Sequence, residues 1–171
     1  MKKKIIIMLV FVIFIGCKEV INKVTVDDKT GRSILVGITD RSAFEFVDFA
    51  EWYNTEYIGY EPDEFIIEQI KELIDSIDIQ IFMGTWCSDS RREVPRFLKI
   101  IDLIEFDQDS LQIINVDRKK KSPTNDEKNK DIKFVPTFII SVNGNEIGRI
   151  VEFPIITLES DLLSILLGID P

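Results

Sequence analysis

Apolar and polar positions alternate along this chain in blocks that predict a series of strands and helices. Five short apolar runs have the length and composition of strands: 33–38, 77–83, 111–117, 136–142 and 146–151. Apolar residues recur at helical spacing after Thr39 or Asp40, and again in 62–74, 88–104 and 158–167. A weaker strand is predicted at 24–26. One parallel βαβ unit therefore precedes an antiparallel hairpin and a final helix. This order predicts an α/β domain with a mixed central sheet and helices on both faces.

Two conspicuous segments are interpreted as structural. Aromatic residues crowd the stretch 44–60, which is predicted to supply core and rim rather than a sugar- or peptide-binding surface. A basic run at 118–121 precedes the polar stretch 122–131. These residues are predicted to form a solvated loop rather than a binding patch.

The N-terminus has the pattern of an export signal. Three lysines at 2–4 precede an uninterrupted apolar run at 5–15, which is too short for a comfortable membrane span. The run ends in Phe14-Ile15-Gly16-Cys17, which resembles the cleavage box of bacterial lipoproteins except that Phe14 stands where an aliphatic residue is usual. The resemblance implies cleavage before Cys17 and lipid on that residue. An ordinary signal peptide or a short uncleaved anchor is the alternative.

This interpretation divides the chain into three parts and indicates a location. Residues 1–16 would be the signal peptide, 17–32 the lipidated cysteine and its tether, and 33–171 the folded domain with a helical extension at its N-terminal side. Lipid on Cys17 would hold the protein to a membrane of the bacterial cell envelope, on the periplasmic side or at the cell surface. Removal of residues 1–16 would also shift the net charge from −9 to −12, so the domain would stand off anionic lipid.

Charge and composition exclude several classes of function. A net charge of −9 argues against a nucleic-acid partner. The chain contains no histidine, which excludes Cys-His hydrolases, Ser-His-Asp triads and histidine-ligated metals. Its two cysteines are too far apart in sequence to suggest a zinc site. No metal and no cofactor are therefore expected.

Cys87 is the residue with the clearest chemical potential. It stands between the predicted strand 77–83 and the predicted helix 88–104. Unpaired backbone N–H groups and the positive end of the helix dipole can favour a thiolate at such a position. The two arginines at 91–92 add positive potential, whereas Asp89 and Glu93 oppose it. The alternative is an inert cysteine that serves only as a small apolar residue.

The residues around Cys87 resemble the thioredoxin family in four features that occur in order. Trp86-Cys87-Ser88-Asp89-Ser90 resembles the family's W-C-x-x-C site, with Ser90 in the second cysteine's place. Pro95 matches the proline of the active-site helix, and Asn143-Gly144 matches the turn of the last hairpin. Val135-Pro136-Thr137-Phe138 resembles the segment whose proline is cis and lies against the reactive sulfur.

This resemblance covers residues 75–167 and implies a thioredoxin-like fold. It also implies that Trp86 covers the sulfur and that the backbone of Val135 and Pro136 binds an extended client. The aromatic segment and the run 87–95 resemble, more loosely, thioredoxin-like lipoproteins of the Bacteroidetes type.

Three departures from the family pattern bear on the chemistry. Ser90 replaces the second cysteine, so Cys87 can attack a disulfide but has no partner to release the product. Its hydroxyl is predicted to donate a hydrogen bond to the thiolate. Ile81 stands where the family has a buried acid, and Glu152 stands where many members have glycine. A lipidated Cys17 would not supply the missing thiol.

Two classes of function remain after these exclusions. The first is a monothiol oxidoreductase or isomerase that exchanges thiols and disulfides with client proteins through Cys87, with Ser90 as a second catalytic-site residue. The second is a non-catalytic binding module that uses the same groove. A one-cysteine peroxidase ranks below both, because such enzymes usually place threonine where this chain has Gly84.

Overall fold

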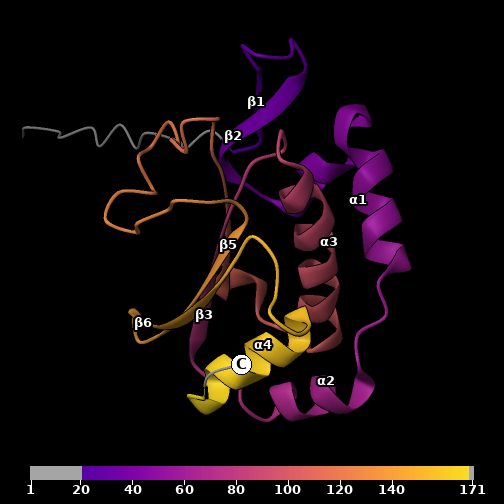
Figure 1. Ribbon diagram of the computed structural model, residues 1–171, viewed down its shortest axis with the longest axis vertical. Coiled ribbons are helices and arrows are strands. Elements are labelled where there is room, and N and C mark those ends of the chain that lie inside the picture. The colour runs from indigo at the N-terminus through magenta and orange to yellow at the C-terminus, as the bar shows by residue number, and fades with distance from the viewer. Residues whose placement is uncertain (1–20, 170–171) are drawn as a thin grey trace, which may run out of the picture.

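The computed structural model describes residues 21–169, which form a mixed sheet with four helices (Figure 1). The six strands are β1 Lys23–Val26, β2 Ser33–Thr39, β3 Ile77–Met83, β4 Leu111–Asn115, β5 Thr137–Val142 and β6 Asn145–Val151. The helices are α1 Val47–Gly59, α2 Glu64–Lys71, α3 Ser88–Leu103 and α4 Leu158–Leu167. Two short 3₁₀ turns, η1 Arg41–Glu45 and η2 Gln108–Ser110, complete these elements.

The strands lie in the order β1-β2-β4-β3-β5-β6. Only β3 and β4 run parallel, with Ile81 opposite Ile113, and α3 connects them. The other neighbouring strands pair antiparallel, including the hairpin β5–β6. The predicted βαβ unit and the predicted C-terminal ββα unit are both confirmed. The architecture is a thioredoxin-like α/β fold, as the sequence predicted.

One face of the sheet packs against all four helices. Alternate residues of β3 (Ile77, Ile79, Ile81 and Met83) point to this side and share one core cluster with residues of every helix. Examples are Phe49 of α1, Ile70 of α2, Phe97 of α3 and Leu162 of α4. The aromatic segment contributes to this core, since Phe44 and Phe49 are buried and Trp52, Tyr53 and Tyr60 pack against it.

The helices do not lie on both faces, which corrects that detail of the prediction. The opposite face carries a small apolar cluster of Phe82, Ile114, Val116, Val135 and Ile139. The connection between β4 and β5, residues 116–136, runs on this side of the sheet (Figure 1). This connection is polar and rich in lysine, and its apolar residues do not recur at helical spacing. It therefore forms turns rather than a helix on this face of the sheet.

The predicted elements match the observed ones, with small shifts at their ends. Asp40 caps η1 rather than a long helix, and its side chain accepts a hydrogen bond from Ser42 N. The main helix α1 then begins at Val47. Asp63 caps α2, within the predicted helical range 62–74, by accepting hydrogen bonds from Phe65 N and Ile66 N. Pro95 lies inside α3.

The weak strand predicted at 24–26 is present as β1, so the end of the predicted tether pairs with β2 in the sheet. The predicted signal peptide and Cys17 lie outside the described residues. None of the helices within 21–169 is long and apolar enough to cross a membrane.

Gly148 sets how closely α4 approaches β6. A Cβ at this position would lie 2.7 Å from Ile165 Cγ2 and 2.8 Å from Ile165 Cγ1. We expect Gly148→Ala to lower the free energy of unfolding by about 1–3 kcal/mol, because Ile165 must move out of its packed position. Urea unfolding of the purified domain would measure the change.

Gly59 provides the matched control, since a Cβ there would meet no atom within 4 Å. Gly59→Ala should leave the stability unchanged or raise it slightly. Equal stability losses for the two variants would contradict the packing argument. Truncation of Ile165 to alanine should make a further Gly148→Ala change nearly neutral.

Candidate functional site

The candidate site begins where β3 ends. The chain leaves β3 at Met83, passes through Gly84-Thr85-Trp86, and reaches Cys87 at the N-cap of α3. Thr85 is fully buried, and its hydroxyl accepts a hydrogen bond of 3.0 Å from Leu35 N of β2. Its carbonyl accepts one of 2.5 Å from Arg91 Nε. Thr85 therefore ties the loop to the sheet and to the first turn of α3.

Trp86 forms one wall beside the sulfur and is fixed at three points. Its indole Nε1 donates to Val116 O at 2.8 Å. The guanidinium of Arg118 lies 4.9 Å from the ring centroid, within the range of a cation–π contact. The ring also covers Gly84, where a Cβ would lie 2.6 Å from the indole. These contacts fix the position of the Trp86 ring next to Cys87.

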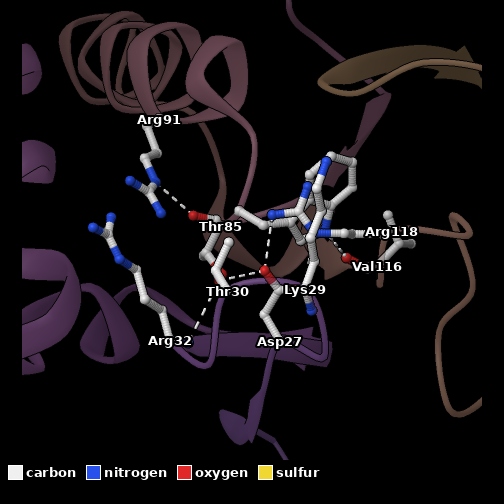
Figure 2. Close-up of polar contacts among 9 residues, drawn as sticks. Asp27, Lys29, Thr30, Arg32, Thr85, Arg91, Val116 and Arg118 are labelled. Atoms are coloured by element: carbon white, nitrogen blue, oxygen red, sulfur yellow. Dashed lines mark hydrogen bonds and ion pairs between the residues drawn. The ribbon is translucent and has the colours of Figure 1, made fainter.

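An ion pair supports this wall from behind. Arg118 Nε and Nη2 each donate to the carboxylate of Asp27 at 2.8 Å, and the Asp27 side chain is buried (Figure 2). Thr30 Oγ1 also donates to this carboxylate. The Arg118 guanidinium and the Thr30 hydroxyl hold the pKa of Asp27 well below its usual range. The first turn after β1 is thus connected to the site through Arg118.

Cys87 lies against the segment before β5. Its sulfur donates to Val135 O at 3.3 Å, and the Val135–Pro136 peptide bond is cis. Val135 and Pro136 are buried, whereas Cys87 is half-buried and packs against the second apolar cluster. The structure therefore brings together Trp86, Cys87, Val135 and Pro136, as the motif match predicted.

Ser90 lies in the same turn but makes a different contact from the predicted one. Its side chain is fully buried, and its Oγ accepts a hydrogen bond of 3.2 Å from Gly84 N. No hydrogen bond joins Ser90 Oγ to the Cys87 sulfur within the described residues. The hydroxyl thus secures the loop before Trp86, because it satisfies a buried backbone N–H that would otherwise be costly.

The two other departures from the family pattern have structural explanations. Ile81 is fully buried in the main core, where an unpaired acid would be costly. Glu152 has φ +63°, a left-handed conformation that favours glycine, and its N donates to Pro136 O at 2.7 Å. Glutamate thus adopts the backbone geometry of glycine beside the candidate site.

The sequence predicted positive charge near Cys87 from the arginines at 91–92, but it did not predict the positions of Arg118 and Arg32. Arg118 was assigned to a solvated loop, yet it covers Trp86, and Arg32 of the predicted tether lies near Arg91 (Figure 2). Arg91 follows Cys87 by one turn of α3, and Arg118 lies over the ring of the preceding Trp86. A positive run after β4 was the only sequence signal for this arrangement. Within residues 21–169, no cluster of histidine, cysteine or acidic side chains is arranged to hold a metal ion.

Comparison with known proteins gives structural neighbours only. No family model and no curated protein matches the chain. A crystal structure of a Pseudomonas aeruginosa protein of unknown function is 14% identical, covers 70% of this chain and 81% of its own, and has a TM-score of 0.50. Mitochondrial thioredoxin 3 from Saccharomyces cerevisiae, in its oxidised form, is 23% identical over 50% of this chain and 76% of its own, with a TM-score of 0.34.

A third structure, an HIV epitope scaffold, is 13% identical and covers 68% of this chain and 71% of its own, with a TM-score of 0.44. These similarities concern the fold alone. The class of protein follows from the arrangement described above. A half-buried cysteine at a strand-to-helix junction, opposite a cis-proline and beside a fixed tryptophan, defines a thioredoxin-like domain.

Asp27 should determine how firmly Trp86 is held. In a Trp52→Phe background, Trp86 is the only tryptophan of the chain. We expect Asp27→Asn to increase acrylamide quenching of Trp86 fluorescence at pH 7, because Arg118 loses its charged partner. Because the pKa of Asp27 is lowered in the folded state, the parent protein should keep its low quenching until the pH falls well below the usual aspartate range.

Asp28→Asn is the matched control, because this neighbouring acid is exposed. It should leave the quenching of Trp86 unchanged. Identical quenching in the Asp27→Asn variant and its parent would show that the ion pair does not position the ring.

Proposed function

We propose that this protein exchanges thiols and disulfides with client proteins through the single thiol of Cys87. The carrying observation is the position of Cys87 at the N-cap of α3, half-buried, with its sulfur 3.3 Å from Val135 O. A cysteine at the N-terminus of a helix, with Arg91 one turn along it, is a common position for a reacting thiol. Cys87 is the only cysteine within residues 21–169.

The proposed reaction has two balanced steps. The Cys87 thiolate attacks one sulfur of a client disulfide, the old S–S bond breaks, and the other client sulfur leaves as a thiolate. A second thiolate, from the client or from another molecule, then attacks the mixed disulfide. This forms a new disulfide on the client side and returns Cys87 to the thiolate. Ser90 cannot take this second role, because its hydroxyl forms no disulfide.

The contact between Cys87 and Val135 supports a link between ionisation and client binding. In the thiol form, the sulfur donates its hydrogen to Val135 O. A thiolate has no hydrogen to donate, so this carbonyl becomes available for a backbone N–H of an extended client. The buried Pro136 and the fixed Trp86 would border such a segment on either side of the sulfur.

Reactivity of Cys87 provides the direct test. We expect iodoacetamide to alkylate Cys87 faster at pH 6–7 than it alkylates free cysteine, of which only a few per cent is thiolate at neutral pH. Peptide mass spectrometry over a time course would give both rates. Alkylation no faster than that of free cysteine would contradict the proposal.

Two variants separate exchange from simple binding. Cys87→Ala should abolish reductant-sensitive adducts captured by acid quench, whereas a non-catalytic binding module would keep its partners after this change. Ser90→Cys should restore a second thiol and allow insulin reduction with dithiothreitol as the electron source, which the unaltered protein should not catalyse. Full retention of partners in Cys87→Ala would favour the binding module.

We also propose that lipid on Cys17 anchors the protein in the bacterial cell envelope. The support is the order of basic residues, apolar run and cysteine at the N-terminus. In a bacterial host that processes lipoproteins, we expect the full chain to fractionate with membranes and to carry an acylated Cys17 after cleavage. Cys17→Ser should abolish acylation, as measured by mass spectrometry. Unmodified Cys17 in the unaltered chain would contradict this assignment.

A further inference from the structure

Arg32 and Arg91 lie close to one another at the N-terminal end of α3. The side chains of Arg32, before β2, and Arg91, in the first turn of α3, extend toward one another (Figure 2). Neither forms an ion pair with a carboxylate within residues 21–169. Burial, followed by the positive charge of Arg32, lowers the pKa of Arg91. The two guanidinium groups therefore repel each other at the start of α3.

Two other arginines of this region are paired with acids. Arg92 contacts Asp89 at 3.1 Å and also pairs with Glu93. Arg118 binds the buried carboxylate of Asp27. Arg92 and Arg118 thus neutralise Asp89, Glu93 and Asp27. Arg32 and Arg91 can therefore bind an anion from outside the chain.

Arg91 is positioned rather than free to turn away. Its Nε donates to Thr85 O, and its guanidinium lies 5.9 Å from the centroid of the Trp52 ring. The Nε contact leaves the terminal N–H groups for another acceptor. A guanidinium held in this way presents paired donors that match a carboxylate.

We propose that Arg32 and Arg91 bind a carboxylate of the thiol or disulfide that exchanges with Cys87. The exchange partner would thus be anionic, with its carboxylate a few bonds from the reacting sulfur. This inference rests on the proposed function of Cys87 and specifies the chemical class of its partner. It also accounts for a local excess of positive charge on a chain whose net charge is −9.

The pair acts at two points in the exchange. A carboxylate between Arg32 and Arg91 would place the attached sulfur near Cys87, and it would relieve the repulsion between the guanidinium groups. Attack by the Cys87 thiolate then breaks the bound disulfide and releases one half as a thiolate. In the second step, a carboxylate-bearing thiolate held near the mixed disulfide would attack the client sulfur, form a disulfide with it, and release Cys87 as a thiolate.

Three small disulfides of different charge test the proposal: dithiodipropionate, which is anionic, hydroxyethyl disulfide, which is neutral, and cystamine, which is cationic. The rate at which each forms a mixed disulfide with Cys87 is measured by mass spectrometry. Each rate is divided by the rate of a neutral model thiol with the same disulfide. We expect the normalised rate to be roughly tenfold higher for the anionic probe than for the neutral one at low salt. The difference should shrink as salt is added.

Arg32→Gln should remove most of the preference for the anionic probe and leave the rate with the neutral probe unchanged. Arg91→Gln should also remove the preference, and it should lower the rate with the neutral probe because it breaks the contact with Thr85 O. Lys71→Gln on α2, at the other end of α3, changes the net charge equally and should have no effect (Figure 1). Arg32 is exposed, so its substitution avoids the structural contact that Arg91 makes with Thr85.

The outcomes separate this inference from the function on which it rests. Equal normalised rates for the three probes would overturn the carboxylate site and leave thiol exchange standing. Failure of Cys87 to react with any probe would overturn both.

Disulfide-linked peptides with aspartate or asparagine beside the cysteine distinguish the source of the carboxylate. A preference for the aspartate peptide would indicate an acidic client segment, and a preference confined to dithiodipropionate would indicate a small acidic thiol.

Discussion

A single buried residue, Thr85, fixes the geometry on which the site depends. Its hydroxyl accepts from Leu35 N of β2, and its carbonyl accepts from the Arg91 side chain. Both atoms lie where solvent cannot replace these bonds, so the loop between β3 and α3 has one favourable placement. That placement puts Cys87 at the helix N-cap and holds Arg91 beside it. The β1–β2 hairpin is part of the site for the same reason, since β2 supplies the partner of the hydroxyl.

The buried carboxylate of Asp27 helps to position the Trp86 ring through Arg118. Asp27 is costly to bury alone, and two hydrogen bonds from Arg118 compensate for this cost. Arg118 is thereby held over the ring of Trp86, whose N–H donates to Val116 O. The indole can occupy this position only because residue 84 is glycine, since a Cβ there would clash with the ring. Residues from the hairpin, the loop and the end of β4 thus determine one surface next to the sulfur.

Local patterns predicted most elements and the central residues of the site. Cys87, Pro136 and the Asn143-Gly144 turn carry short-range signals, because strand-to-helix junctions and hairpins depend on residues close in sequence. Asp27 and Arg118 are 91 positions apart, and no periodicity links them. The sequence also predicted helices on both faces of the sheet. The structure has them on one face, because the long connection 116–136 forms turns on the other face rather than a helix. The contact of Ser90 with Gly84 N was hidden for a similar reason, since its burial is a tertiary property.

The loss of the second thiol and the presence of spare arginines have a common consequence. A two-cysteine site completes its reaction within one chain, so it needs no particular charge on an outside thiol. A one-cysteine site must receive that thiol from elsewhere, and each encounter then depends on orientation and local concentration. Charged groups near the sulfur can increase such encounters, whereas Ser90 can only maintain the loop. The arginines at 32 and 91 would therefore raise the local concentration of the outside thiol by electrostatic attraction. A second cysteine achieves the same effect because it belongs to the same chain.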